Sequence, residues 1–101
     1  MKFLVLATPR TDAPVAQDWL TLYQATTAWI ESRLKSGQLE CVYQRLQGRG
    51  VAIVNVNTAE ELWEGIASYP LTAQLEWQVE PLFDVGYVFN RAIETLKKAS
   101  E

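Results

Sequence analysis

The chain has 101 residues, of which 49% are hydrophobic, and its formal net charge at pH 7 is −3. This length predicts one domain with enough apolar material for one core. A mild negative charge without a clustered basic face argues against binding to nucleic acid. The single cysteine excludes an intrachain disulfide, and the absence of histidine excludes a Ser–His triad and histidine-based metal or haem sites.

The amino-terminal apolar run, Met1–Ala7, ends at Thr8-Pro9-Arg10 and is shorter than the core of a signal peptide. No segment approaches the ~20 apolar residues of a membrane-spanning helix. We therefore expect a soluble, cytoplasmic protein with no membrane partner.

Lys2–Thr8 is apolar on both alternating faces, which is typical of a strand in the middle of a sheet. Asp12 or Ala13 then leads into a first helix with Pro14 near its first turn. Gly37 ends this helix. Helical spacing predicts one core-facing stripe along it: Ala16, Leu20, Tyr23, Thr27, Ile30 and Leu34.

Leu39–Gln47 alternates as a second strand. One face carries Leu39, Cys41, Tyr43 and Arg45, and the other carries Glu40, Val42, Gln44 and Leu46. A glycine-bearing hairpin turn at Gln47–Gly50 leads into a third strand, Val51–Val56, which is again apolar on both faces.

Thr58 and Glu61 have the spacing of a capping box at the start of a second helix, Thr58–Ser68, which Pro70 ends. Gln74–Leu82 is the fourth strand. Its polar face carries Gln74, Glu76, Gln78 and Glu80, and its apolar face carries Leu75, Trp77 and Val79. Tyr87–Lys98 follows as an amphipathic tail helix.

This order of elements predicts an α+β fold: a ferredoxin-like βαββαβ sandwich with a C-terminal helix. Right-handed crossovers leave the first and third strands central and both main helices on one face. Residues 1–82 form the protomer and residues 83–101 a helical extension of the same domain. The second face of the sheet is too apolar to remain in water, so we expect it to pair with a second copy in a homodimer or higher oligomer.

In one of two interpretations, Glu76 and Gln78 face a cavity between the paired sheets. A desolvated carboxylate there has a raised pKa and can act as a general acid or base, so Glu76 is the candidate catalytic residue. Arg45 can bind an anionic ligand bidentately, and Tyr43 offers a hydroxyl beside an apolar ring. In the alternative interpretation, Glu76 lies on a half-exposed edge strand and Arg45 pairs with Glu40 or another surface acid.

The chain is rich in large aromatic residues, which anchor a core or an interface or form the wall of an apolar pocket. Among the aromatic residues, Trp19 and Trp77 are candidates for substrate binding. Gln78 is a further candidate. Cys41 is interpreted as a small buried hydrophobe, because no histidine is available to activate it. No metal site is expected.

Several stretches, in order and spacing, resemble the muconolactone delta-isomerase-like family of the dimeric α/β-barrel superfamily. They are Gly37, Gly48-Arg49, Val54–Leu62, Tyr69-Pro70-Leu71 and Glu76–Leu82, and the resemblance covers about Met1–Leu82. It implies a ferredoxin-like protomer that pairs sheet to sheet, with further assembly into rings among the isomerases. It also implies proton transfer on a small lactone acid without a metal or organic cofactor. The isomerases carry a histidine close to the position of Cys41 and a more charged first helix, so no catalytic residue is transferred from them.

Three functions follow from these observations. The first is a cofactor-free isomerase in which Glu76 moves a proton on a small cyclic or carboxylated metabolite, Arg45 holds an anionic group, and Tyr43 with Trp19 or Trp77 lines the pocket. The second is a non-catalytic small-molecule-binding or assembly module. The third is a cofactor-less monooxygenase.

Overall fold

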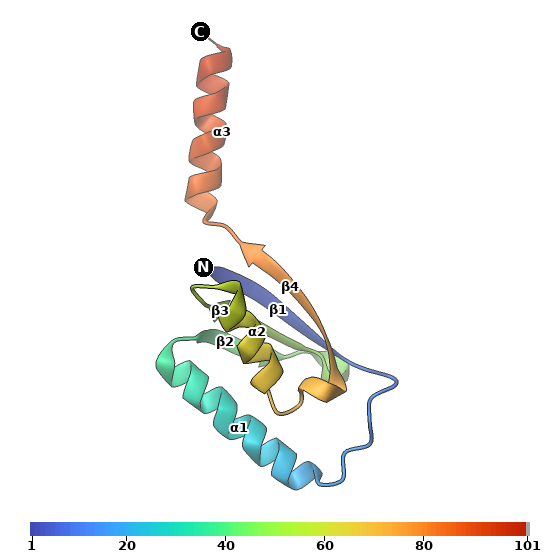
Figure 1. The fold of residues 1–101 in the computed structure, drawn as a ribbon. Coiled ribbons are helices and arrows are strands. Elements are labelled where there is room, and N and C mark those ends of the chain that lie inside the picture. The colour runs from blue at the N-terminus through green and yellow to red at the C-terminus, as the bar shows by residue number, and fades with distance from the viewer. Residues whose placement is uncertain (101) are drawn as a thin grey trace.

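The computed structural model describes residues 1–100. Its elements, in chain order, are β1 (Lys2–Pro9), α1 (Trp19–Ser36), β2 (Leu39–Gln44), β3 (Gly50–Asn55), α2 (Ala59–Ser68), β4 (Leu75–Leu82) and α3 (Val85–Ala99). The four strands form one antiparallel sheet in the order β2-β3-β1-β4, and α1 and α2 lie on the same side of it (Figure 1). The predicted ferredoxin-like order, with the first and third strands central and a C-terminal helix, is confirmed.

The register of the sheet defines two faces. Val5 pairs with Ala52 and Val79 on the face that α1 and α2 cover, here called the front face. Leu6 pairs with Val51 and Gln78 on the opposite side, the back face. Along β4, Leu75, Trp77 and Val79 are half-buried and Glu76, Gln78 and Glu80 are exposed, so the predicted alternation is confirmed from Leu75 to Glu80. Gln74 precedes the strand.

The predicted start of the first helix is wrong. α1 begins at Trp19, because Asp18 is its N-cap: the Asp18 carboxylate accepts hydrogen bonds from the backbone N–H and the hydroxyl of Thr21, at 3.0 and 2.7 Å. These bonds hold the pKa of Asp18 below its ordinary value. The segment around Pro14 is a loop instead, and the Gln74 side chain donates a hydrogen bond to the Pro14 carbonyl at 2.9 Å.

The predicted core stripe of this helix is also wrong. Leu20, Tyr23, Thr27 and Leu34 are exposed, and only Ile30 of the residues assigned to the stripe within α1 is half-buried. The residues that turn away from solvent are Leu22, Thr26, Trp29, Ile30 and Arg33. Thr26 can be buried there because its hydroxyl donates to the Leu22 carbonyl at 2.8 Å.

The second strand is shorter than predicted. β2 ends at Gln44, so Arg45 lies in the β2–β3 hairpin, where Gln47 and Gly48 have left-handed backbones with φ of 63° and 71°. A bulge between Leu39 and Cys41 puts Leu39 opposite Val54 and Cys41 opposite Ile53. Because Val54 is on the front face and Ile53 on the back face, the prediction that Leu39 and Cys41 share a face is wrong.

The other helix boundaries follow their predicted signals. The Thr58 hydroxyl accepts from the Glu61 backbone N–H at 3.1 Å, and the Glu61 carboxylate accepts from the N–H of Asn57 at 2.9 Å, one residue earlier than in a standard capping box. Gly37 ends α1 with φ of 83°, and its N–H donates to the Leu34 carbonyl.

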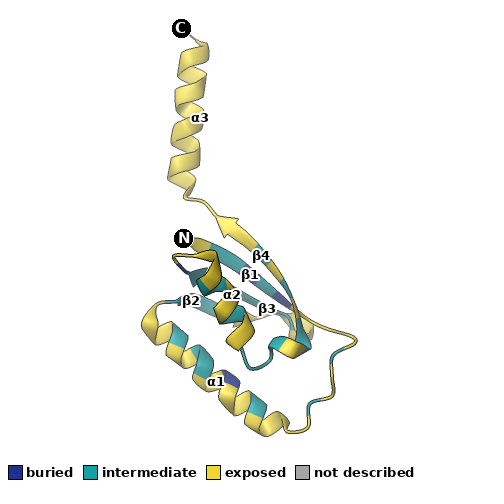
Figure 2. Ribbon diagram, viewed as in Figure 1, coloured by how far each residue is buried: buried dark blue, intermediate teal, exposed yellow. Residues whose placement is uncertain are grey.

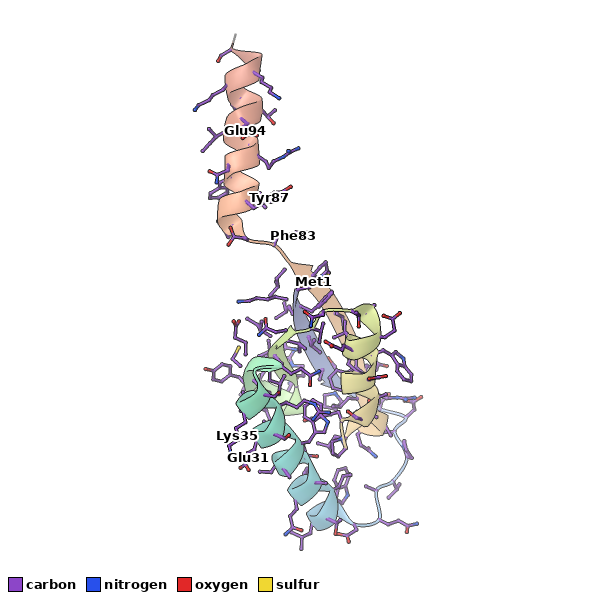
Figure 3. All side chains as sticks on the ribbon, turned by 60° about the vertical axis from the view of Figure 1, so that its left-hand side comes forward. Met1, Glu31, Lys35, Phe83, Tyr87 and Glu94 are labelled. Atoms are coloured by element: carbon purple, nitrogen blue, oxygen red, sulfur yellow. The ribbon has the colours of Figure 1, made fainter. Side chains whose placement is uncertain are left out.

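α3 extends away from the sheet, and every one of its residues is exposed (Figures 1 and 2). Its side chains project into open space on all sides (Figure 3). The radius of gyration is 17.8 Å, against about 13 Å for a compact chain of this length. No helix within residues 1–100 is long and apolar enough to cross a membrane.

The protomer has a small core. Within residues 1–100 the buried residues are Val5, Ala7, Thr26, Leu39 and Val56. The chain exposes 7617 Å² of surface, against roughly 5,800 Å² for a compact monomer of this mass. The excess comes from α3 and from helices that stand off from the sheet and leave space beneath them.

Candidate functional site

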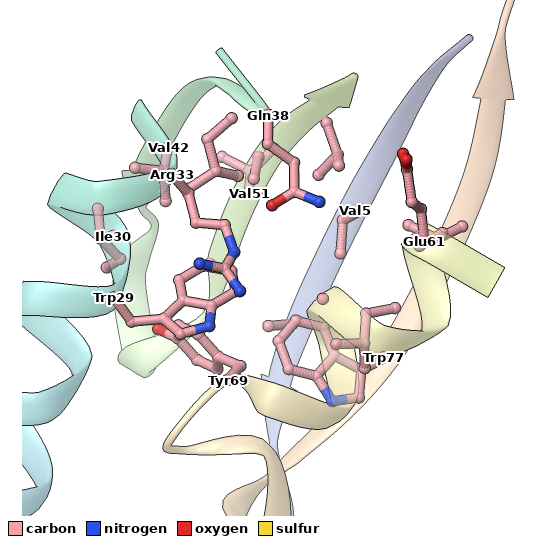
Figure 4. Close-up of a pocket in the computed structure, with 18 residues that line it drawn as sticks. Val5, Trp29, Ile30, Arg33, Gln38, Val42, Val51, Glu61, Tyr69 and Trp77 are labelled. Atoms are coloured by element: carbon pink, nitrogen blue, oxygen red, sulfur yellow. The ribbon is translucent and has the colours of Figure 1, made fainter. Parts of the chain in front are cut away.

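A cavity of about 90 Å³ lies between the front face of the sheet and helices α1 and α2 (Figure 4). Its floor is formed by sheet residues such as Val5, Ala7 and Ala52, and α2 contributes Leu62 and Ile66. The lining is predominantly apolar, which suits the flat, apolar part of a small ligand.

Three aromatic rings form a row along one side of this cavity: Trp29 from α1, Tyr69 from the turn after α2, and Trp77 from β4. The Tyr69 centroid is 5.0 Å from that of Trp29 and 5.6 Å from that of Trp77, both in edge-to-face geometry. The indole N–H groups donate to the hydroxyls of Ser68 and Thr72, each at 3.1 Å. The rings are therefore held in place by packing and hydrogen bonds, as a preformed binding wall requires.

Tyr69 is the titratable member of this row. Its burial raises the pKa of the phenol above the ordinary value of 10.0, because a low-dielectric environment disfavours the phenolate. At neutral pH the group is an un-ionised hydroxyl that can donate a hydrogen bond or a proton to a ligand oxygen.

Arg33 also lines the cavity, one helical turn after Trp29. Its Cζ lies 4.5 Å from the centroid of the Trp29 ring, in cation–π contact (Figure 4). Its Nη2 is 3.5 Å from the Ser68 hydroxyl, and its Nε is buried without a hydrogen-bond partner in the described part of the chain.

Of the site residues predicted from sequence, only Trp77 lines this cavity. Glu76 and Gln78 are exposed on the back face, opposite Thr8 and Leu6 of β1. Tyr43, which is 69% exposed, pairs with Val51 and so belongs to the same back-face row as Gln78. The fold thus brings Tyr43, Glu76 and Gln78 onto one side of the sheet and Trp77 onto the other.

The other two predicted site residues lie apart from both groups. Arg45 is in the β2–β3 hairpin, and its buried Nε has no hydrogen-bond partner among residues 1–100. Glu40 pairs with Lys2 at 2.7 Å, so the suggested Arg45–Glu40 pair is wrong. Trp19 is in the first turn of α1, 43% exposed, with its ring centroid 5.5 Å from that of Tyr23.

Sequence reasoning missed Arg33 as a site residue. A signal was present in the spacing of Trp29 and Arg33, since side chains four positions apart on a helix contact each other. In the structure Trp29 and Arg33 form a stacked pair, and both residues lie on the side of α1 that is turned away from solvent.

Glu61 lines the cavity, and its carboxylate accepts the Asn57 N–H through one of its oxygens. Cys41 is a free, half-buried thiol on the back face. Within residues 1–100 no group of three or more His, Cys, Asp or Glu side chains is placed to hold a metal ion.

No family model and no curated protein matches the sequence. Several solved structures resemble the fold, among them the following two. 5-Chloro-2-hydroxyhydroquinone dehydrochlorinase from Burkholderia phenoliruptrix AC1100, in complex with 2,5-dihydroxybenzoquinone, has a TM-score of 0.67 and 20% identity over 86% of this chain and 98% of its own. Muconolactone isomerase has a TM-score of 0.62 and 19% identity over 83% of this chain and 90% of its own. The chain therefore shares the ferredoxin-like fold of these two structures, and the resemblance to muconolactone isomerase predicted from its sequence is confirmed at the level of the fold.

Proposed function

We propose that this protein binds a small, planar, cyclic metabolite in the front cavity and moves a proton on it without a cofactor, as an isomerase-like protein. The observation that carries the proposal is the aromatic row of Trp29, Tyr69 and Trp77 beside an apolar cavity. A flat ring gains the most contact against such a wall, and each aromatic pair adds about 0.5–1.5 kcal/mol beyond its buried area. Two proteins of the same fold support a ligand of this kind, since one is named for a lactone and the other holds a benzoquinone.

Two cavity residues have the chemistry for a proton transfer. Tyr69, un-ionised at neutral pH, is the group that donates a proton to a developing oxyanion. Glu61 is the acidic residue among those that line the cavity and is the candidate base, and its carboxylate accepts the Asn57 N–H at 2.9 Å. Glu76 remains the proposed catalytic residue only for a site built between two paired back faces.

The second candidate is a binding protein without catalysis. It is favoured by the exposure of Glu76 and by the predominantly apolar lining of the cavity. Turnover separates it from the first candidate, because a binding module holds the ligand and returns it unchanged. Oxygen uptake in the same reactions would identify a cofactor-less monooxygenase instead.

We also propose that the back face pairs with the back face of a second copy. Leu4, Leu6 and Ile53, which are half-buried in the single chain, form an apolar centre there. Sedimentation equilibrium should find a dimer or larger species that Leu6→Lys dissociates; an 11.4 kDa species at micromolar concentration would contradict the pairing.

A matched pair of substitutions tests where the ligand binds. Tyr69→Leu removes a ring from the front cavity, and Tyr43→Leu removes one from the back face. Binding of 2,5-dihydroxybenzoquinone is measured by quenching of tryptophan fluorescence, and turnover of muconolactone by absorbance. We expect Tyr69→Leu to weaken binding about tenfold, the effect of losing an aromatic contact and its buried area, and Tyr43→Leu to leave it unchanged. The reverse result, or loss of turnover in Glu76→Gln alone, would move the site to the back face.

A further inference from the structure

We infer that Arg33 is the anion-binding residue of the front cavity, so that the ligand is a planar ring carrying an oxyanion. The inference rests on the proposed function and deepens it. It assigns a negative charge to the ligand and names Arg33 as the residue that binds this charge. The evidence comes from the missing partners of Arg33, from its stacked geometry and from the surrounding charges.

The Arg33 guanidinium forms no ion pair within residues 1–100. The ion pairs formed within residues 1–100 are Lys2–Glu40 and Arg10–Asp12, and Arg33 takes part in neither. Its buried Nε donates to no acceptor in the described chain, and its one hydrogen bond is the long 3.5 Å contact with Ser68. Buried charged donors are normally paired, and a bound anion would supply both the missing acceptor and the missing charge.

The geometry of Arg33 suits an oxyanion at the cavity. Trp29 covers one face of the guanidinium, with 4.5 Å between Cζ and the ring centroid. The Trp29 ring is in turn held by its hydrogen bond to Ser68 at 3.1 Å, and Ser68 donates to the Gly65 carbonyl at 3.1 Å. Stacking of this kind fixes the plane of the guanidinium while leaving N–H groups at its edge, which is the arrangement that binds planar oxyanions.

The nearest acidic residue of the cavity does not neutralise Arg33. Glu61 lies at the cavity, but its carboxylate accepts the Asn57 N–H at 2.9 Å and is not within ion-pair distance of Arg33. The rest of the lining is predominantly apolar. A ligand that satisfies the whole cavity therefore has a flat apolar body beside the aromatic row and one oxyanion directed to Arg33.

Two chemical groups supply such an oxyanion, a carboxylate and an acidic enol, and paired probes distinguish them. Benzoate and benzamide have the same shape and differ in charge. 2,5-Dihydroxybenzoquinone ionises at its enol oxygens, whereas its dimethyl ether cannot. All four are titrated at pH 7 into the wild-type protein, Arg33→Gln, Arg33→Lys and a control, Arg49→Gln. Arg49 is a hairpin arginine whose Nε donates to the Leu46 carbonyl and which does not line the cavity.

We expect the wild-type protein to bind at least one anionic probe about tenfold more tightly than its neutral counterpart, as a charge-assisted contact to arginine requires. Arg33→Gln should abolish that preference and leave the neutral probe unaffected, Arg33→Lys should retain part of it, and Arg49→Gln should behave as wild type. Circular dichroism establishes that the variants are folded. If Arg33→Gln unfolds, the role of Arg33 is judged from two measurements: the preference of the wild-type protein for the anionic probe, and the part of that preference that Arg33→Lys retains.

Equal binding of charged and neutral probes by the wild-type protein overturns the role of Arg33, while leaving the cavity as a site for neutral rings. An anionic preference that survives in Arg33→Gln also overturns it. Failure of all four probes to bind to the wild-type protein overturns both this inference and the proposed function.

Discussion

Gly65→Ala tests whether the space under the helices exists in solution. Gly65 lies in α2 and lines the front cavity, and a Cβ built at this position meets no heavy atom within 4 Å. The backbone is helical there, so alanine fits without a change of φ or ψ. In a packed core the same methyl group would clash with its neighbours and the protein would lose stability.

The expected gain follows from the backbone alone. Alanine is about 1 kcal/mol more favourable than glycine inside a helix, because glycine loses more conformational freedom on folding. The methyl group meets no neighbour, so we add no term for packing or for clash. For a domain of this size, about 1 kcal/mol raises the melting temperature by roughly 4–8 °C.

The assay is urea denaturation followed by circular dichroism, with a thermal melt for the shift in melting temperature. Gly37→Ala is the matched control: its Cβ also meets nothing within 4 Å, but its φ of 83° is left-handed. That variant should lose about 1–2 kcal/mol. A destabilised Gly65→Ala would show that α2 packs tightly on the sheet and would remove the cavity. If the cavity is the ligand site, Gly65→Ala should also bind 2,5-dihydroxybenzoquinone more weakly although it is more stable.

Three further changes follow from other parts of the structure. Thr58→Ala should lower the free energy of unfolding by about 0.5–2 kcal/mol, because it removes the N-cap of α2; Thr58→Ser should retain it, and equal urea midpoints for the two variants would contradict the cap. The folded state keeps Tyr69 protonated above the ordinary pKa of 10.0, so stability should fall as pH rises from about 10 toward the raised pKa. This loss should be absent from urea midpoints of Tyr69→Phe. Truncation after Asp84 should leave the melting temperature of the monomer unchanged, since α3 does not pack on the sheet; an unfolded product would show that the helix is needed for folding.

The features that were predicted correctly from the sequence are determined by residues close to one another in the chain. The alternation of β4 is set by the two-residue period of a strand, and it needs no knowledge of the partner strand. Thr58 with Glu61, Pro70 and Gly37 act through bonds and sterics within one helical turn, so the ends of the helices could be located from the residues themselves. Apolar residues on both faces of the first and third strands were sufficient to place them in the middle of the sheet.

α1 shows where local signals conflict. The sequence predicted a start at Asp12 or Ala13, whereas the helix begins after Asp18, whose carboxylate accepts two hydrogen bonds from Thr21. Apolar residues occur on more than one side of the helix, with Leu20 and Tyr23 exposed and Leu22 turned inward. The helical period of apolar residues therefore did not determine which side of α1 is buried. Packing against the sheet determined it.

The sequence by itself determined the order of strands and helices and the two-faced character of the sheet, because these follow from periodicity and from steric rules between adjacent residues. Only the tertiary structure decided the site. Trp29, Tyr69 and Trp77 come from three elements, and they meet because both helices cross the same face of the sheet. That Arg33 forms no ion pair within residues 1–100 likewise depends on which acidic residues the fold brings near it. Such distances cannot be obtained from spacing along the chain.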